Sequence, residues 1–433
     1  MDPPLDAIQV GDTFRLVHDL PAQSIDTVWS SPPYFGQRDY RILDVGTFSS
    51  VDEAEAWSES AAAEFQNNQI SCHPDVMWSG EKWLCRVLLD DPNPYGMEST
   101  PSEYIDRTLL LFHDLRRVLK PWGTVWWNVG DTYLTYSTVG HRNKELALIP
   151  FRLAIALVDE GWLPRNVVAW CKNNTMPSSV RDRLSCAWEP IFLLAHPDSG
   201  GDYYFNLDKI RQPHKSEGTT NWKQGLENGG LSHTTQAGHR ARLTVGDGGL
   251  GRTKAISSFK NYIGHPLGKN PRDHINTVRL GSEHQGHFAT QPEALVHRFL
   301  PATLPRKVCC ACGRPQGRYF KVNERSTGDW RTLAVQSGRP SGDQGVGRSG
   351  GNSGLRGARG AQEGTWVAYG CDCRAPTRPG IVLDPFMGSG TTALVAKRLR
   401  CHFIGFDRNP RYAALTHERL ARESHPLFEG LTP

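Results

Sequence analysis

The apolar positions along the chain fall into two patterns, short unbroken runs and longer stretches with a helical period. The runs "IDTVWS" (25–30), "GTVWWNVGD" (123–131), "RNVVAWCK" (165–172) and "WEPIFLLAH" (188–196) are rich in apolar and β-branched residues, as in strands buried on both faces. Other stretches carry apolar residues every three or four positions, as amphipathic helices do. Strands that alternate with helices are typical of a parallel α/β sheet.

The clearest helix is predicted over residues 102–119. Its apolar face is formed by Tyr104, Leu109, Leu111, Phe112, Leu115 and Leu119. Ser102 is expected to cap the first turn, and Pro121 and Gly123 are expected to end the helix. The same period predicts helices over residues 148–162 and 292–304.

The two ends of the chain carry compact successions of elements. Residues 7–34 indicate a strand, a turn, a short helix, a strand and a loop. Residues 380–420 indicate a strand, a glycine loop, a helix, a second strand and a second helix. This C-terminal stretch is therefore a complete βαβ unit.

Three stretches interrupt the regular pattern. Residues 41–100 are polar and irregular in sequence and are interpreted as an insertion. Residues 200–280 are rich in Gly, Asn, Thr and basic residues, and the Gly/Ser/Arg-rich tract within residues 325–365 is expected to form a flexible loop.

Composition narrows the class of protein only slightly. The chain has 433 residues and a net charge of +4, which is compatible with a nucleic-acid partner but does not establish one. It has no secretory signal pattern and no run of eighteen apolar residues, so we expect a cytoplasmic protein with no membrane contact.

The cysteines suggest a metal site rather than a disulfide framework. Half of the ten cysteines lie between Cys309 and Cys373. The pairs Cys309-x-x-Cys312 and Cys371-x-Cys373 offer four thiolates, the number that a structural tetrahedral zinc ion requires. Cys310 is a further candidate, and the alternative is a set of reduced cysteines without metal.

The glycine loop at residues 385–390 carries the most informative chemistry. Gly388 and Gly390 allow a ligand to approach the backbone, and Asp407 ends the next strand, where a carboxylate can accept hydrogen bonds from ribose hydroxyls. Thr391 follows Gly390 where a phosphate-binding loop would have lysine. Asp384 would repel a diphosphate and attract a sulfonium group. The residues therefore favour S-adenosylmethionine over NAD or ATP.

The motifs "SPPY" (31–34) and "DPFMGSGTT" (384–392), in this order, resemble those of the permuted β-group of amino-methylating DNA methyltransferases. The resemblance covers about residues 1–40, 95–195, 268–305 and 379–425. It implies a doubly wound, Rossmann-like methyltransferase fold with permuted motif order. By this resemblance the domains are a catalytic half (1–200, with the insertion at about 41–100), a target-recognition region (201–280), a cofactor-closing segment (281–305), a zinc-ribbon-like insertion (306–378) and a cofactor-binding half (379–433).

The resemblance also assigns cofactor-binding residues. The methionine end of S-adenosylmethionine would lie against Asp384, Phe386, Gly388 and Gly390, and Asp407 would hold the ribose. Thr391 is a further candidate for the cofactor site. Asp12 would lie near the adenine amino group. Phe288 and Thr290, in "HFATQPEALV", would close over the methionine end.

The "SPPY" corner suits an exocyclic amine, whose lone pair is delocalised into the base. Acceptors aimed at the amine hydrogens favour a pyramidal nitrogen, and the Ser31 hydroxyl and the Pro32 carbonyl can supply them. Pro32 and Pro33 fix the backbone φ angle and donate no hydrogen bond. Tyr34 can stack on the base, which must first rotate out of the duplex at a cost of a few kcal/mol.

The expected function is site-specific methylation of the N4 amine of cytosine in double-stranded DNA, because serine at the first motif position resembles the cytosine-amino subgroup. The resemblance implies a restriction–modification role, with a possible cognate endonuclease acting on the same site, or a role in phage self-protection. The alternatives are adenine N6, an RNA or protein-amide substrate, and a non-catalytic zinc-containing DNA-binding protein. Basic residues in 208–280 are candidates for target recognition, and Trp170, Lys172, Arg181 and Arg183 for contacts to the flipped base or its phosphates.

Overall fold

The computed structural model describes two compact units. The described residues are 3–37, 42–67, 70–79, 81–91, 94–135, 141–173, 175, 179–213, 267–277, 291–322 and 364–423. The first unit comprises residues 1–206, 272–317 and 370–433, and the second comprises residues 207–271 and 318–369. The predicted motifs and the cysteine cluster belong to the first unit.

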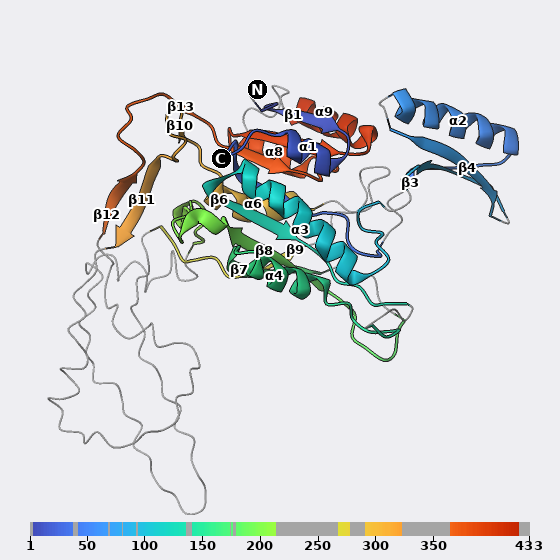
Figure 1. Cartoon of the computed structure of the whole chain (residues 1–433), viewed down its shortest axis with the longest axis horizontal. Helices are drawn as coiled ribbons and strands as arrows, with labels where there is room; N and C mark the ends of the chain where they lie inside the picture. Colours follow the sequence, from blue (N-terminus) through green and yellow to red (C-terminus); the bar gives the residue numbers. More distant parts are fainter. Residues whose placement is uncertain are drawn as a thin grey trace, which may run out of the picture. The chain divides into compact units, whose positions relative to one another are not determined.

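An eight-stranded sheet forms the centre of the first unit (Figure 1). Its order is β1 (Ala7–Val10), β15 (His402–Asp407), β14 (Ile381–Asp384), β2 (Ile25–Ser30), β6 (Leu119–Asn128), β8 (Trp188–Ala195), β7 (Leu163–Lys172) and β9 (His274–Thr277). The C-terminal strand β14 therefore lies beside the N-terminal strand β2, although more than 350 residues separate their sequences.

The expectation of a parallel sheet is right for seven strands and wrong for β8, because β7 and β9 run in the same direction as β6. Strands β1, β15, β14, β2 and β6 are parallel, whereas β8 runs antiparallel to both β6 and β7. A parallel neighbour requires a long crossover, usually a helix, and the described residues between β7 and β8 contain none. The sheet is therefore mixed.

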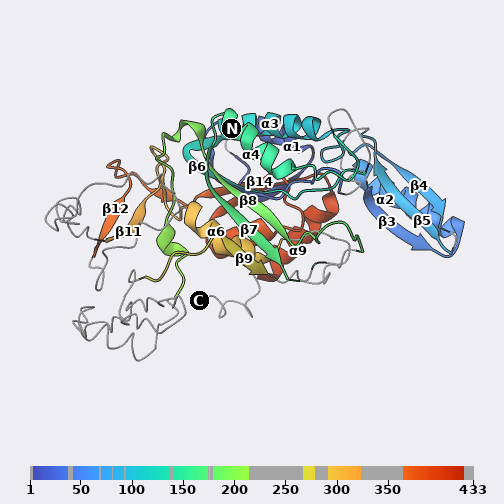
Figure 2. The ribbon, with the colours of Figure 1, turned by 90° about the horizontal axis from the view of Figure 1, so that it is seen from below.

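Helices cover both faces of the sheet (Figure 2). One core contains residues of α1 (Thr13–Asp19), α3 (Pro101–Val118) and α4 (Ile149–Asp159), and the other contains residues of α6 (Glu293–Thr303) and α8 (Thr391–Arg398). Helix α9 (Pro410–Glu423) packs beside α8. Neighbouring side chains of β6 enter opposite cores, Trp127 the first and Trp126 the second, which explains its unbroken apolar run.

The ends of α3 differ from the prediction. The side chain of Thr100, not Ser102, caps the helix and accepts a hydrogen bond from the Glu103 backbone N–H at 3.2 Å. The helix ends at Val118, and β6 begins at Leu119, so Pro121 and Gly123 lie inside a strand. Pro101 at the first helical position explains the earlier start, because its fixed φ suits that position.

Residues 42–89 form a regular module, so their interpretation as irregular is wrong. Helix α2 (Val51–Asn67) packs on an antiparallel sheet of β3 (Ile42–Phe48), β5 (Trp83–Leu89) and β4 (Cys72–Trp78). The buried face of α2 consists of Ala54, Ser58, Ala61, Ala62 and Phe65. A stripe of small residues gives little apolar signal in a helix otherwise rich in glutamate.

The remaining described elements are short. Strand β10 (Val308–Cys309) pairs with β13 (Thr377–Arg378) in the first unit, and η1 (Pro197–Ser199) follows β8. Strands β11 (Gly317–Val322) and β12 (Gly364–Tyr369) pair with each other, and η2 (Leu207–Lys209) opens the second unit.

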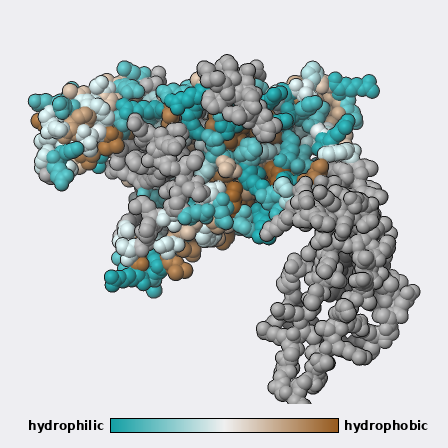
Figure 3. Space-filling model, turned by 180° about the vertical axis from the view of Figure 1, so that it is seen from behind, coloured by the Kyte–Doolittle hydropathy of each residue, from teal (hydrophilic) through white to brown (hydrophobic). Residues whose placement is uncertain are grey.

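Much of the predicted target-recognition region and of the Gly/Ser/Arg tract lies outside the described residues. Among the described helices, none has the length and apolar character needed to cross a bilayer. One face of the molecule shows hydrophobic surface residues scattered among hydrophilic ones (Figure 3).

Candidate active site

The serine–proline corner and the glycine loop meet at the carboxyl ends of neighbouring strands. β2 and β14 are parallel, with Thr27 opposite Val382 and Val28 opposite Leu383. Where the strands end, the Ser30 hydroxyl donates a 2.7 Å hydrogen bond to Asp384 Oδ1. The structure thus brings together the two motifs that the sequence analysis singled out.

The Asp384 carboxylate anchors the glycine loop through hydrogen bonds. Its buried carboxylate accepts hydrogen bonds from Ser30, from the Thr392 hydroxyl at 2.6 Å and from the Phe386 backbone N–H at 3.1 Å. Gly390 has φ of +80°, and a Cβ there would lie 2.1 Å from Thr416 Cγ2. Only glycine fits at this position.

Asp407 holds the same loop from the next strand. Its Oδ2 accepts a 2.8 Å hydrogen bond from the Gly388 N–H, and its Oδ1 accepts one of 2.8 Å from the Asn409 N–H. Burial raises the pKa of both Asp384 and Asp407 to about 6 against these hydrogen bonds. A buried and a half-buried carboxylate beside a glycine loop form a site that favours a cationic ligand.

Asp12 lies near Asp407, since the Gly11 N–H donates to the Asp407 carbonyl, and the Asp12 side chain has structural partners there. Its Oδ1 accepts hydrogen bonds from the backbone N–H groups of Phe14 and Arg15, which caps α1. Its Oδ2 pairs with Arg408, and this arginine also donates to Asp91 Oδ2 at 3.0 Å. If Asp12 binds adenine, it does so while it also caps α1 and pairs with Arg408.

An aromatic stack joins the proline corner to the glycine loop. The Tyr104 hydroxyl donates a 2.9 Å hydrogen bond to the Pro33 carbonyl. The Tyr104 ring stacks on Tyr95 at 5.1 Å, and Tyr95 stacks on Phe386 at 5.4 Å. Tyr95 is a residue that the sequence analysis missed, because it lies within residues 41–100, the stretch interpreted as an irregular insertion.

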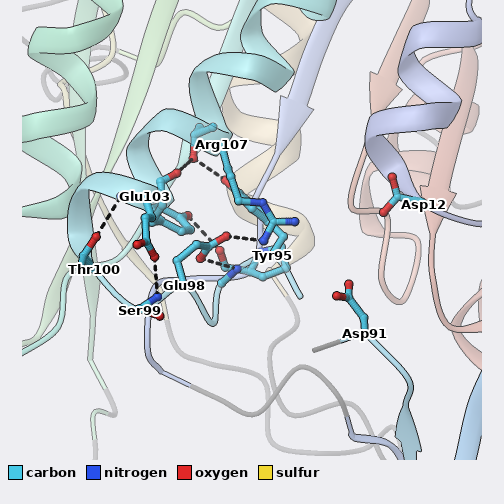
Figure 4. A network of polar contacts seen from close by, with 12 residues as sticks. Asp12, Asp91, Tyr95, Glu98, Ser99, Thr100, Glu103 and Arg107 are labelled. Carbon is cyan, nitrogen blue, oxygen red and sulfur yellow. Dashed lines mark hydrogen bonds and ion pairs between the residues drawn. The ribbon is translucent and has the colours of Figure 1, made fainter. Parts of the chain in front are cut away.

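An ion pair between the half-buried Arg107 and the buried Glu98 stabilises this stack (Figure 4). Arg107 of α3 donates to Glu98 Oε1 at 2.9 Å, and its guanidinium lies 5.7 Å from the centroid of the Tyr95 ring. Glu98 Oε2 accepts the Gly96 N–H at 2.9 Å. Desolvation raises the pKa of the Glu98 carboxyl despite the neighbouring arginine. Asp12 and Asp91 lie beside this network in the same view.

Asn128 and Gln291 are further residues that the sequence analysis missed. Asn128 Oδ1 accepts hydrogen bonds from Ser31 at 3.3 Å, Tyr34 at 2.9 Å and Gln291 Nε2 at 3.1 Å. Gln291 also accepts a 2.8 Å hydrogen bond from Trp29 Nε1. The available signal was the position of Asn128, a polar residue at the carboxyl end of a buried strand.

The predicted closing residues Phe288 and Thr290 lie outside the described residues, which resume at Gln291. The Gln291 carbonyl accepts a 3.3 Å hydrogen bond from the Thr391 hydroxyl. The chain that follows those two residues therefore lies against the start of α8.

The other predicted substrate contacts have separate environments. Trp170 is buried, and its Nε1 donates to Thr277 Oγ1 at 2.6 Å, so it belongs to the core. Lys172 pairs with Glu189. The Arg183 guanidinium lies 3.6 Å from the centroid of the Tyr133 ring, and Arg181 is exposed.

The four predicted metal ligands come together. The Sγ atoms of Cys309, Cys312, Cys371 and Cys373 all lie within 4.8 Å of one another. Four thiolates around zinc at about 2.3 Å would lie about 3.8 Å apart, so the cluster fits this ion. Cys310 is exposed and is not a member of the group.

A mixed α/β sheet with a glycine loop and a carboxylate at adjacent strand ends is the architecture of nucleoside-binding α/β proteins. The family model described as DNA methylase matches residues 25–307 and 376–418. The chain therefore belongs to this family, that of the N6 and N4 DNA methyltransferases.

Curated relatives are type II methyltransferases. M.SfiI of Streptomyces fimbriatus is 36% identical over 219 residues, which cover 48% of this chain and 40% of that protein. M.SmaI of Serratia marcescens is 30% identical over 227 residues, 48% of this chain and 60% of that protein. The chain thus spans about half the length of these relatives. M.BglII of Bacillus subtilis is 22% identical over 425 residues, 97% of this chain and 70% of that protein.

Two solved structures are distantly similar. The PvuII DNA methyltransferase (cytosine-N4-specific) is 15% identical with a TM-score of 0.46, and the alignment covers 95% of this chain and 85% of that one. A putative DNA modification methylase from Thermus thermophilus, complexed with S-adenosyl-L-methionine, is 14% identical with a TM-score of 0.40, over 97% and 95% of the chains.

Proposed function

We propose that this protein is an S-adenosylmethionine-dependent methyltransferase that modifies the exocyclic N4 amine of cytosine at a specific site in double-stranded DNA. The observation that carries the proposal is the hydrogen bond between Ser30 and Asp384. It holds the amine-binding corner and the methyl-donor loop at one edge of the sheet. Membership in the DNA methylase family gives the reaction class.

The cofactor proposal rests on the chemistry of the glycine loop. When bound, S-adenosylmethionine supplies a methyl group activated by its sulfonium charge. The buried carboxylate of Asp384 and the half-buried carboxylate of Asp407 favour that charge, and each Asp407 oxygen, which accepts one backbone N–H, retains acceptor capacity for a ribose hydroxyl. The resemblance adds Asp12, Phe386, Gly388 and Gly390 to this site, with Phe288 and Thr290 closing it, and Thr391 is a further candidate.

The amine would be oriented by Ser31 and the Pro32 carbonyl. Tyr104 fixes the next carbonyl, that of Pro33, so the backbone of the corner is held rigidly. Transfer would then depend chiefly on the placement of amine and methyl donor. Tyr34 is the proposed stacking residue, and its hydroxyl is anchored in the Ser31–Asn128 network.

The choice of cytosine rests on serine at position 31, and adenine N6 is the alternative. The test is incubation of the protein with plasmid DNA and isotopically labelled S-adenosylmethionine, followed by mass spectrometry of the nucleosides. We expect labelled N4-methylcytosine; labelled N6-methyladenine would select the alternative. Label in RNA or protein only would refute a DNA substrate, and failure to bind S-adenosylmethionine would favour a non-catalytic DNA-binding protein.

The biological setting follows from the type II relatives. We propose a cytoplasmic enzyme of a restriction–modification system, with residues 201–280 as target-recognition region and a cognate endonuclease that cuts the same sequence. Methylome sequencing of a host that expresses the protein would give the recognition sequence. Cleavage of unmodified host DNA by a neighbouring gene product would identify the nuclease.

We further propose a structural zinc ion at Cys309, Cys312, Cys371 and Cys373. The pairing of β10 with β13 places Cys309 opposite Thr377, next to Arg378. Arg378 donates to the buried Asp26 of β2, which also accepts the Ile381 N–H of β14 at 2.8 Å. The cysteine cluster thus adjoins the starts of both motif strands.

Elemental analysis of the purified chain is expected to find one zinc ion. The Cys373→Ser variant should bind zinc weakly and melt at a lower temperature, since structural zinc contributes folding energy. The matched Cys310→Ser variant should retain the ion. Absence of zinc from the wild type and from both variants would refute the site.

A further inference from the structure

A chain of hydroxyl groups leads from Ser31 to a carboxylate that the sequence analysis did not single out. The Ser31 and Tyr34 hydroxyl oxygens lie 3.0 Å apart, and the Tyr34 hydroxyl donates to Glu189 Oε2 at 3.0 Å. Glu189 lies on β8, and its other oxygen pairs with Lys172 of β7. Four residues from three parts of the chain thus form one continuous polar path.

The proposed reaction needs an outlet for a proton. Methyl transfer to an exocyclic amine forms an N–C bond and breaks the C–S bond of the donor. The sulfur becomes a neutral thioether, and the nitrogen carries one proton in excess of the neutral product. Ser31 can pass this proton on only if its own hydroxyl proton moves to a neighbour.

We propose that Glu189 is the terminal acceptor of the amine proton, reached through Ser31 and Tyr34; the inference rests on the proposed function. The amine proton moves to Ser31 Oγ, the Ser31 proton moves to Tyr34 Oη, and the Tyr34 proton moves to Glu189. The carboxylate becomes a neutral carboxylic acid, and the methylated amine leaves uncharged.

Asn128 accepts hydrogen bonds from the same hydroxyl groups but cannot take up the proton. Its Oδ1 lies 2.9 Å from the Tyr34 hydroxyl and 3.3 Å from that of Ser31. Its Nδ2 donates to the Pro190 carbonyl at 3.1 Å, which fixes the orientation of the amide. An amide oxygen accepts hydrogen bonds without taking up a proton near neutral pH, so Asn128 can align the hydroxyls while Glu189 receives the charge.

The surroundings of Glu189 suit this role. The Glu189 side chain is 15% exposed and that of Lys172 is 12% exposed, so the lysine charge stabilises the carboxylate while one edge reaches solvent. Through that edge the proton can leave after each turnover. The Tyr34 ring packs against Gly130, where a Cβ would lie 2.6 Å from Tyr34 Cε2, and this contact holds the hydroxyl in line.

The test uses single-turnover methyl transfer by the full chain at saturating DNA and saturating S-adenosylmethionine across pH 4 to 9. The wild-type rate should rise with pH and then level off. Glu189→Gln should slow transfer by about 100-fold, at the low end of general acid–base effects, and should lose the acid limb of the profile. Its affinities for S-adenosylmethionine and DNA should match those of the wild type.

Two further variants separate a proton acceptor from a structural residue. Tyr34→Phe breaks the path and should reproduce the loss, and it serves if Glu189→Gln does not fold. Lys172→Met should move the acid limb to higher pH, because the carboxylate loses the cation that stabilises its charge. Transfer by Glu189→Gln within twofold of wild type, or a slow rate with an unchanged pH profile, would overturn the inference. A wild-type protein that transfers no methyl group would instead refute the proposed function.

Discussion

The two sides of the candidate site are built from different chemistry. On the glycine-loop side, the carboxylates of Asp384 and Asp407 are tied to backbone N–H groups at short range. On the proline-corner side, Ser31, Tyr34 and Asn128 form a half-buried network of hydroxyl and amide groups. The first arrangement fixes the glycine loop and holds negative charge beside it. The second contains hydroxyl protons, those of Ser31 and Tyr34, that can be exchanged. In the proposed function, the glycine-loop side binds the cofactor and the proline-corner side carries out the chemistry.

The adjacent serines give the largest test of this division. Ser31→Ala should lower the single-turnover rate at least 100-fold with unchanged cofactor affinity, because an aligned acceptor is lost at the reacting amine. Ser30→Ala should weaken S-adenosylmethionine binding about tenfold, since it removes a hydrogen bond to a buried carboxylate. Calorimetry and rapid-quench kinetics measure the two effects. If both variants changed the cofactor affinity and the transfer rate to the same extent, the two sides would not have separate roles.

Gly390→Ala tests whether the glycine loop is rigid. The left-handed φ costs a non-glycine residue about 1–2 kcal/mol, and the clash with Thr416 adds to this. We expect a clear fall in melting temperature and loss of cofactor binding. Adding Thr416→Ala should restore part of the stability, because it removes the nearest atom but not the strained φ. A variant as stable as wild type would show that the loop can adjust.

Acidic pH should increase the contribution of the glycine-loop side to folding stability and decrease its affinity for a sulfonium ligand. Asp384 and Asp407 have folded-state pKa values raised to about 6 from 3.8, so the folded chain binds these protons more readily than the unfolded chain. Their contribution to stability therefore increases as pH falls from 6 towards 4.

Affinity for a sulfonium ligand should fall over the same range, by up to about tenfold per pH unit for each carboxyl. Calorimetric titration between pH 5 and 7 measures it, and Asp407→Asn should flatten the dependence. Affinity that is constant across this range would contradict the assignment of these acids to the cofactor.

Tyr104→Phe gives the smallest expected effect and probes the link between the two sides. It removes one hydrogen bond to the Pro33 carbonyl and preserves the ring stack with Tyr95. The loss of about 1 kcal/mol should appear as a fivefold to tenfold slower transfer, with cofactor affinity unchanged. A change in affinity alone would assign Tyr104 to the glycine-loop side.

The sequence was sufficient for features that depend on local pattern. The strand-to-loop transitions at Ser31 and Asp384 are marked by apolar runs followed by proline or glycine, and their positions are confirmed. The pairing of β7 with β8 was not predictable, because each strand has the same apolar run in either direction. The cap at Thr100 was missed because Ser102 offers the same side-chain chemistry two residues later.

The polar network was harder to predict. Asn128 and Glu189 each occupy one polar position in an apolar strand, and only the register of β6 against β8 brings them to Tyr34. Tertiary register is not encoded in the local period of a sequence. A search for polar residues at the carboxyl ends of buried strands would have found Asn128 but not Gln291 or Glu189.

The position of β14 between β15 and β2 has a consequence for synthesis of the protein. While the ribosome is still making the segment before residue 381, β2 has no neighbour on one side, and β1 has no partner in the sheet. Folding of the central sheet must wait for the last strands, and contacts of such long sequence separation form slowly. The nascent chain therefore cannot complete this sheet until the segment that carries the glycine loop emerges.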